Sequence, residues 1–135
     1  DDNTYEWCAP GIKPEKENLQ NVPPEVEANW YRRFEEGKSV IIDDLEDIKE
    51  NDPLQYENLK RQGINSLVVV PLYDNGKVIA FYGVDNPPPV VLYYSHDMLQ
   101  IAASFIIACL KRKKLLSKLM ELSYTLLLNS VIDLL

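Results

Sequence analysis

Residues 64–87, INSLVVVPLYDNGKVIAFYGVDNP, form the stretch that decides the fold. Two runs rich in β-branched and aromatic residues, 64–73 and 77–84, flank the pair Asn75-Gly76. Asn-Gly between two apolar runs is the strongest short-range signal of a β-hairpin, because both residues tolerate the positive φ angles of a two-residue turn. Both faces of the second run are largely apolar, so we expect that strand to be covered on both sides.

Four more elements are predicted upstream of this hairpin. Residues 24–36 and 53–62 are predicted helices, because each begins with a proline in its first turn and ends at a glycine. In the second, Asn51-Asp52 also supplies a capping side chain just before the proline. Residues 39–42 predict a short buried strand. Residues 1–7 combine β-branched and aromatic side chains, which favours an extended strand.

A long helix is predicted to begin at His96, with Ser95 as its cap. Four of its leucines step by 4, 3 and 4 residues, which is the a/d spacing of a two-stranded seam. An apolar seam beyond a domain needs a partner, so we expect a homodimer through this helix. We therefore divide the chain into a sensor domain, 1–114, and a signalling or dimerisation helix, 115–135. The four leucines are Leu115, Leu119, Leu122 and Leu126.

Composition limits the class of protein and its partners. The chain has 135 residues, enough for one domain, with 46% apolar and 26% charged residues, as in globular proteins. A formal net charge of −7 makes nucleic acid an unexpected partner, since it leaves little surface to collect phosphates. The acidity is regional: residues 1–60 carry 16 acidic and 7 basic side chains, and the remainder carries 5 and 7.

The cysteines and the apolar stretches predict the compartment. Cys8 and Cys109 belong to no C-x-x-C pair, so we expect reduced packing residues and neither a zinc knuckle nor a redox pair. No signal peptide is recognisable. The apolar stretch 98–110 is shorter than the about 20 residues that span a bilayer. We expect a soluble, cytoplasmic protein without direct membrane insertion.

Three polar features favour structural over catalytic roles. His96 is the only histidine, and the sequence has neither a nucleophile elbow nor a phosphate-binding glycine loop, so we expect no catalytic residues. The acidic residues within 43–47 lack the spacing of a calcium loop, which favours a solvated helix start over a metal site. The basic run 111–114 is interpreted as a solvated collar between two apolar stretches of one helix.

Aromatic side chains are the better candidates for ligand contacts, because ligand pockets are lined mainly by such groups with a few polar ones. Asp85 follows a covered strand on the face that carries Phe81, so its carboxyl group must be paired, capped or turned to a wet cavity. The aromatic residues would supply apolar contacts and the acids would orient the ligand, whose identity, like that of any cofactor, is unknown. The candidate ligand-binding residues are Trp7, Trp30, Phe34, Asp43, Phe81 and Asp85.

Four motifs together resemble the GAF domain of bacterial signalling proteins: YEWC at 5–8, GIxSLxxxPL at 63–72, the Asn75-Gly76 turn, and GVDNP at 83–87. The resemblance covers roughly residues 1–120. It implies an α+β fold with a central antiparallel β-sheet, helices on both faces, a small-molecule pocket and a long C-terminal helix. The first helix and first strand of such a domain have no counterpart in this chain.

The resemblance also implies a regulatory role. In GAF proteins of this appearance the last helix leads into a diguanylate cyclase domain through a Ser-Tyr-Thr-Asp linker. Residues 123–125 match the first three positions, and Leu126 replaces the aspartate. The Asn-Lys-x-Asp-Glu motif of phosphodiesterase GAF domains is absent, which argues against a cyclic-nucleotide ligand.

The sequence therefore leaves two alternative functions open. The first is a small-molecule sensor that couples pocket occupancy to a dimeric C-terminal helix and an output domain such as a diguanylate cyclase. The second is a ligand-free interaction or dimerisation module whose pocket is filled by its own aromatic side chains. A third, reduction of methionine sulfoxide, needs two neighbouring thiols, and Cys8 and Cys109 are predicted on different elements. We expect these residues not to form an enzyme.

Overall fold

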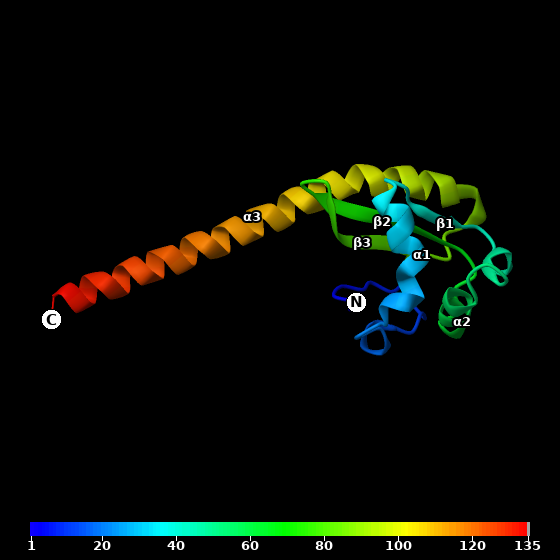
Figure 1. The fold of residues 1–135 in the computed structure, drawn as a ribbon, viewed down its shortest axis with the longest axis horizontal. Helices are drawn as coiled ribbons and strands as arrows, with labels where there is room; N and C mark the ends of the chain where they lie inside the picture. The colour runs from blue at the N-terminus through cyan, green and yellow to red at the C-terminus, as the bar shows by residue number, and fades with distance from the viewer. Residues whose placement is uncertain (135) are drawn as a thin grey trace.

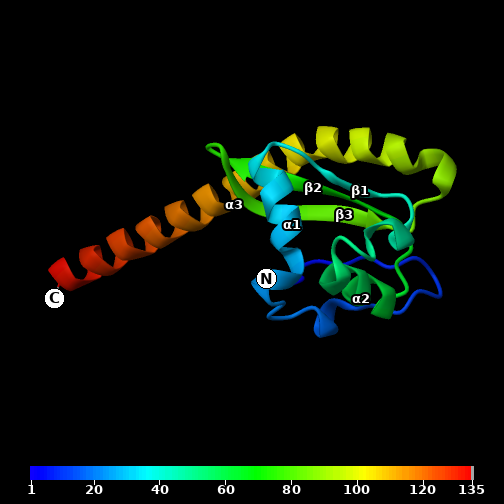
Figure 2. The same cartoon turned by 45° about the vertical axis from the view of Figure 1, so that its right-hand side comes forward.

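The computed structural model describes residues 1–134, which form three layers (Figure 1, Figure 2). The middle layer is an antiparallel sheet in the order β1 (Val40–Ile42), β2 (Leu67–Asp74), β3 (Lys77–Asp85). Helices α1 (Pro24–Glu35) and α2 (Pro53–Arg61) lie on one side of it, and α3 (Leu92–Asp133) runs along the other and projects far beyond it. The predicted α+β class, with helices on both faces of an antiparallel sheet, is confirmed. The described residues also contain three short 3₁₀ turns, which are η1 (Lys16–Asn18), η2 (Leu45–Ile48) and η3 (Pro89–Val91).

The predicted hairpin joins β2 and β3. Asn75 and Gly76 have φ angles of 50° and 76°, so both central residues of the turn adopt the left-handed conformation that a two-residue hairpin turn requires. The register pairs Asp74 with Lys77 and, after a shift between Leu72 and Tyr73, continues along both strands. Asn-Gly was therefore a sufficient local signal.

Strand β2 is buried on both faces. Leu67 and Val69 belong to the core beneath α1 and α2, whereas Val68 and Val70 point to the opposite side, where α3 lies. This explains why its sequence is an uninterrupted apolar run rather than an alternating one. Strand β3 was expected to be covered on both sides, and this was wrong. It is an edge strand, and the rings of α1 cover it at Phe81 but leave Ile79 exposed.

The predicted strand over residues 1–7 is not formed. This segment is irregular, because no other strand in residues 1–134 lies beside it to satisfy its backbone groups. Isolated contacts hold it instead. The Asn3 N–H donates to the Leu19 carbonyl over 2.8 Å, and the Glu6 carboxylate accepts from the backbone N–H of Glu15 at 3.0 Å and of Lys16 at 2.6 Å.

The predicted helices form, with one change at a terminus. Asp52 caps α2 as expected, its side chain accepting from the Gln55 N–H over 3.2 Å. Helix α3 begins at Leu92 rather than at His96, because η3 leads directly into it and Leu92 is buried against the domain. Ser95 consequently does not cap the helix; its hydroxyl donates to the Val91 carbonyl.

Helix α3 is continuous across the division expected after residue 114, and residue 135 of the predicted segment 115–135 lies outside the described residues. The expectation of two packing cysteines was wrong for Cys109, which is exposed on α3, while Cys8 is half-buried. The stretch around Cys109 was interpreted as core because it is apolar on all sides, but only one side of α3 faces the sheet.

Candidate functional site

Three of the six candidate site residues meet between α1 and the sheet. The ring centroids of Trp30 and Phe34, on α1, lie 5.7 Å and 5.6 Å from that of Phe81, on β3. The Tyr31 ring lies 6.0 Å from that of Phe81 and edge-on to it. These distances, and the edge-to-face angles of the Trp30 and Tyr31 rings to Phe81, are favourable for aromatic pairs. Trp30 is 8% exposed and Phe34 is fully buried, so the rings occupy the space that a ligand would need there.

The other three candidates lie outside this aromatic cluster. Trp7 is 85% exposed, in the irregular N-terminal segment. Asp43 follows β1, and its Oδ2 atom accepts from the Tyr93 hydroxyl of α3 at 3.3 Å. Asp85 is on the face of β3 that carries Phe81, but at the far end of the strand. The structure therefore does not bring the six residues into a single site.

Asp85 lies close to other ionisable groups of the N-terminal segment. Partial desolvation, followed by the nearby Glu6 carboxylate, raises the pKa of Asp85 above its ordinary value, although the residue as a whole is exposed. Desolvation and Glu6 also raise the pKa of the Cys8 thiol, which disfavours its reactive thiolate form. The end of β3 near residues 6–8 is thus an acidic, partly desolvated place that favours cationic or neutral groups.

Glu27 is the polar residue that the sequence reasoning missed. It is 8% exposed on α1, and within residues 1–134 its Oε2 atom has no hydrogen-bond partner. Desolvation raises the pKa of Glu27. The available signal was its spacing of three, four and seven residues from Trp30, Tyr31 and Phe34, which places all four on one helical face.

A cleft lies on the opposite side of the sheet, between α3, β2 and the segment that leads into β1. Its volume is about 220 Å³, and Ser39, Tyr73 and Gln100 provide its polar lining. Beside it, the Nε2 atom of His96 lies 3.0 Å from the Ser39 hydroxyl, and Nδ1 lies 3.3 Å from the carboxylate of Asp97.

This order of groups resembles a catalytic triad, but its third member does not fit. The aspartate of a triad is buried and holds the imidazole in place, whereas the Asp97 side chain is 75% exposed and belongs to the same helical turn as His96. The Ser39–His96 contact is better understood as a structural contact that attaches α3 to the start of β1. The expected structural role of His96 agrees with this geometry.

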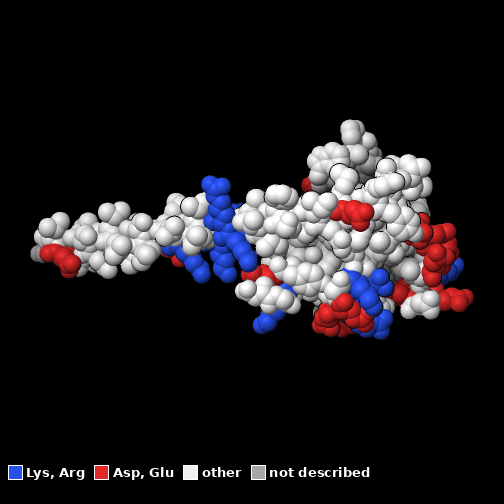
Figure 3. Space-filling view, turned by 90° about the horizontal axis from the view of Figure 1, so that it is seen from above, with Lys and Arg blue, Asp and Glu red and all other residues white. Residues whose placement is uncertain are grey.

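The acidic and basic runs are solvated, as expected. The Asp44 side chain accepts from the Glu46 N–H over 2.9 Å and caps η2. No group of three or more His, Cys, Asp or Glu side chains in residues 1–134 is placed to hold a metal ion. The basic collar, residues 111–114, surrounds α3 where it leaves the domain (Figure 3), and Lys111 forms an ion pair of 2.7 Å with Asp74 of the hairpin.

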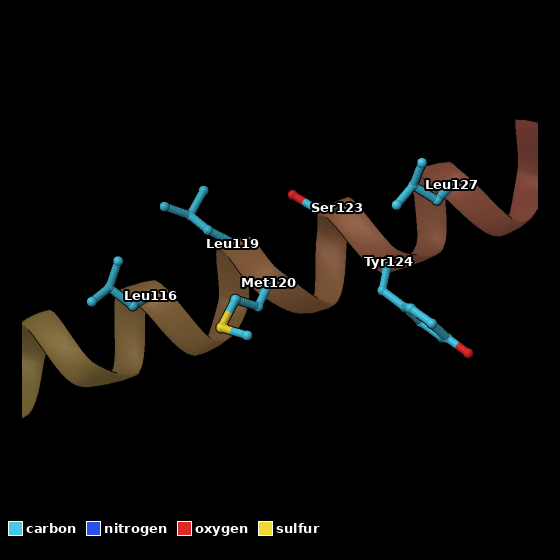
Figure 4. Close-up of a pocket in the computed structure, with 6 residues that line it drawn as sticks. All are labelled: Leu116, Leu119, Met120, Ser123, Tyr124 and Leu127. Carbon is cyan, nitrogen blue, oxygen red and sulfur yellow. The ribbon is translucent and has the colours of Figure 1, made fainter.

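The projecting part of α3 beyond the collar is apolar and exposed. A shallow depression of about 420 Å³ runs along one side of it (Figure 4). By length and composition alone, the segment Pro89–Asp133 is apolar enough to cross a membrane, with a mean hydropathy of 1.3 in its best 18-residue window. This differs from the expectation based on the stretch 98–110 by itself. The depression is lined by Leu116, Leu119, Met120, Ser123, Tyr124 and Leu127.

A family model described as GAF domain matches residues 1–106. No curated protein and no solved structure matches the chain. The matched region includes the whole sheet, α1, α2 and the first part of α3.

Proposed function

The chain belongs to the GAF domain family, whose members are regulatory and commonly ligand-binding, and from this premise we propose that it is the input module of a signal-transduction protein. The main support for this proposal is helix α3. It packs on the sheet at one end and continues as one helix beyond the domain at the other. In the proposed role, the state of the domain is passed through α3 to an output domain such as a diguanylate cyclase.

Specific contacts attach α3 to the sheet and support this coupling. Leu92 is buried at the start of the helix, His96 contacts Ser39 of the segment leading into β1, and the Tyr82 hydroxyl of β3 donates to the Leu99 carbonyl. A displacement of the sheet therefore moves the helix with it. A ligand drives such a change only through its different affinities for the two states of the domain.

Two kinds of input are compatible with this role. A small molecule would bind on the α1 side of the sheet, between the aromatic cluster and Asp85, where the neighbouring Glu6 disfavours an anion. The second candidate is a ligand-free interaction or dimerisation module, and the aromatic packing favours it. Trp30, Phe34 and Phe81 already contact one another, and Phe34 is fully buried.

Thermal unfolding of the chain with a panel of metabolites and nucleotides separates these inputs. A ligand at 100 times its Kd stabilises the folded state by about 2.7 kcal/mol. The sensor predicts such a shift for at least one class of compound, and predicts that Asp85→Asn reduces it while the exposed control Asp97→Asn does not. A flat response of the unmodified chain over the whole panel would leave the interaction module as the function.

The proposal also covers the division of the module, its oligomeric state and its location. Residues 1–114 act as the sensor domain and 115–135 as the signalling helix, in a cytoplasmic homodimer without membrane insertion. Two observations support this: the thiols Cys8 and Cys109 are both free, and the most apolar helix is fastened to the sheet through His96 and Leu99.

A further inference from the structure

Helix α3 loses its packing against the domain before it leaves the sheet. Leu92 is buried and Ile107 is partly buried, whereas every described residue from 108 to 134 is exposed. Within residues 1–134, one ion pair joins α3 to the rest of the domain, and it lies beyond this packing. The Nζ atom of Lys111 is 2.7 Å from the Oδ1 atom of Asp74, at the end of β2. We call this contact the exit ion pair.

The Asp74 carboxylate depends on the Lys111 ammonium group to compensate its charge. The Oδ1 atom is buried, and in the described part of the chain no hydrogen bond reaches it. Ion pairs between well-hydrated surface groups contribute little to stability. A buried carboxylate oxygen is different, because removal of its cation leaves a charge that water does not compensate. The exit ion pair is therefore more than a contact between two solvated side chains.

The two partners of the exit ion pair are nevertheless able to separate. The Asp74 side chain is 33% exposed and the Lys111 side chain is 57% exposed, so each has a path to water. A second cation is also at hand, since Lys77 is the register partner of Asp74 across the turn and its side chain is exposed. The contact thus has two discrete arrangements. In the closed one Asp74 is paired with Lys111, and in the open one it is turned to Lys77 or to water.

The β2–β3 hairpin connects the exit ion pair with the aromatic cluster on the other side of the sheet. Asp74 lies at the turn, and Phe81 lies on β3, where it is paired with Pro71 of β2. The ring of Phe81 contacts Trp30 and Phe34 of α1. Because the two strands are paired along their length, a displacement of Phe81 moves the turn as well. An event on the α1 side of the sheet thereby reaches the exit ion pair.

We propose that the exit ion pair is a switch that sets the direction of the projecting helix. While it is closed, α3 stays alongside the hairpin as far as Lys111. When the hairpin carries Asp74 away, the pair opens and α3 turns about its other contacts, at Leu92, His96 and Leu99. This deepens the proposed function, on which it rests, by naming the contact that regulates the output helix. An input acts on the switch through unequal affinities for the closed and open states.

Neutral variants of the full chain test the switch. Lys111→Gln and Asp74→Asn each remove one partner, so each should populate the open state. Lys113→Gln is the matched control, because it removes the same charge from the opposite side of the same helical turn. The double variant should resemble either single variant, since all three lack the same contact. A double variant that shows the sum of two separate effects would refute the pair as their common cause.

Electron paramagnetic resonance between two spin labels measures the direction of α3. In a Cys8→Ser, Cys109→Ser background, one label is attached at Glu57→Cys on α2 and the other at Glu121→Cys on the projecting helix, both exposed positions. The second label lies about 15 Å further along α3 than Lys111, at 1.5 Å of rise per residue, which enlarges the effect of a turn. Dilution with unlabelled chain restricts the signal to distances within one molecule.

The two arrangements predict different distance distributions. The unmodified pair and Lys113→Gln should give one narrow distribution, and Lys111→Gln should add a second population at another distance. Both lysines are exposed, so circular dichroism and Tm should stay close to those of the parent chain. Identical distributions in Lys111→Gln and Lys113→Gln would overturn the inference.

The switch and the sensor fail in different experiments. A compound of the ligand panel that stabilises the chain, while Lys111→Gln keeps the distribution of the control, would contradict only the switch. A flat panel together with a second population in Lys111→Gln would leave the switch in place and remove the sensor.

Discussion

The hydroxyl of Ser39 and the Nε2 atom of His96 lie 3.0 Å apart and join the start of β1 to the second turn of α3. Ser39 is buried and the His96 side chain is largely covered, so water competes little for this contact. It links α3 to the residue before β1, as the Tyr93–Asp43 hydrogen bond links α3 to the residue after it, and it lies beside the cleft that Gln100 and Tyr73 line.

Removing this link should loosen the start of α3. Ser39→Ala is expected to cost about 1 kcal/mol, the usual net value of one intramolecular hydrogen bond. Hydrogen exchange should become faster for amides of residues 92–100 and stay the same in α2. Ser104→Ala is the matched control, because Ser104 lies on α3 but its hydroxyl only bonds to the Ile101 carbonyl of its own helix. Equal exchange in both variants would show that the fastening has no effect.

Glu27 should make the protein less stable at neutral pH. Burial raises the pKa of Glu27, so the folded chain holds that proton more tightly than the unfolded chain does. The resulting stabilisation is full below the ordinary glutamate pKa of 4.5 and is lost as pH rises through the folded-state pKa.

Glu27→Gln should therefore stabilise the chain by about 1 kcal/mol at pH 7, the lower end of the penalty for a buried group without a partner. At pH 3 it should have little effect. Urea denaturation at the two pH values measures the difference, with exposed Glu25→Gln as the control. A Glu27→Gln variant less stable than the unmodified chain at pH 7 would mean that the carboxylate is paired in solution.

Phe81 is the centre of the aromatic cluster. Truncation to alanine removes its contacts with Trp30, Tyr31 and Phe34 together, and we expect a loss of about 3 kcal/mol, at the low end for buried phenylalanine because Phe81 is only half-buried. Chemical denaturation monitored by tryptophan fluorescence reports it directly, since Trp30 lies beside the site. Ile79→Ala, on the same strand but exposed, should cost far less.

Gly83 is a position where only glycine fits. A Cβ atom there would lie 2.3 Å from the Val68 carbonyl oxygen and 2.9 Å from a methyl carbon of Val69, and the first of these is backbone that moves only with the sheet. Gly83→Ala should lower stability by roughly 2–3 kcal/mol through overpacking. Gly63→Ala, where φ is +73° but the space is open, should cost about 1 kcal/mol. A reversed order of the two Tm values would contradict this account of β3.

The sequence predicted those parts of the fold whose signals are local. The Asn75-Gly76 turn and the Asp52 cap act through their own backbone and needed no tertiary information. Residues 1–7 have strand composition, but within residues 1–134 no strand lies beside them, and composition alone does not reveal which neighbours a segment has. Ser95 failed as a cap because the burial of Leu92, a tertiary effect, moved the helix start upstream.

The candidate site was less predictable than the fold. Trp30, Phe34 and Phe81 were chosen by type and face, and these three do meet. Trp7 was chosen as an aromatic residue of the predicted strand 1–7 and Asp43 as an acid after the predicted strand 39–42. Residues 1–7 are irregular instead, and the path of an irregular segment follows no periodicity. Glu27 was overlooked because a glutamate on a helix that also carries Glu25 and Glu35 resembles a solvent-facing residue until its spacing from the aromatic stripe is considered.

The 42 residues of α3 form one rod about 60 Å long, at 1.5 Å of rise per residue. Its attachments run from Leu92 through His96 and Leu99 to Lys111, which pairs with Asp74 of the hairpin, so about half of the rod is held against the domain and the other half projects freely. A tilt of the held half about the point where α3 leaves the domain therefore swings the free tip through a comparable distance in the opposite direction. Rearrangements inside the domain are thereby carried, along a single rigid element, to whatever the tip bears.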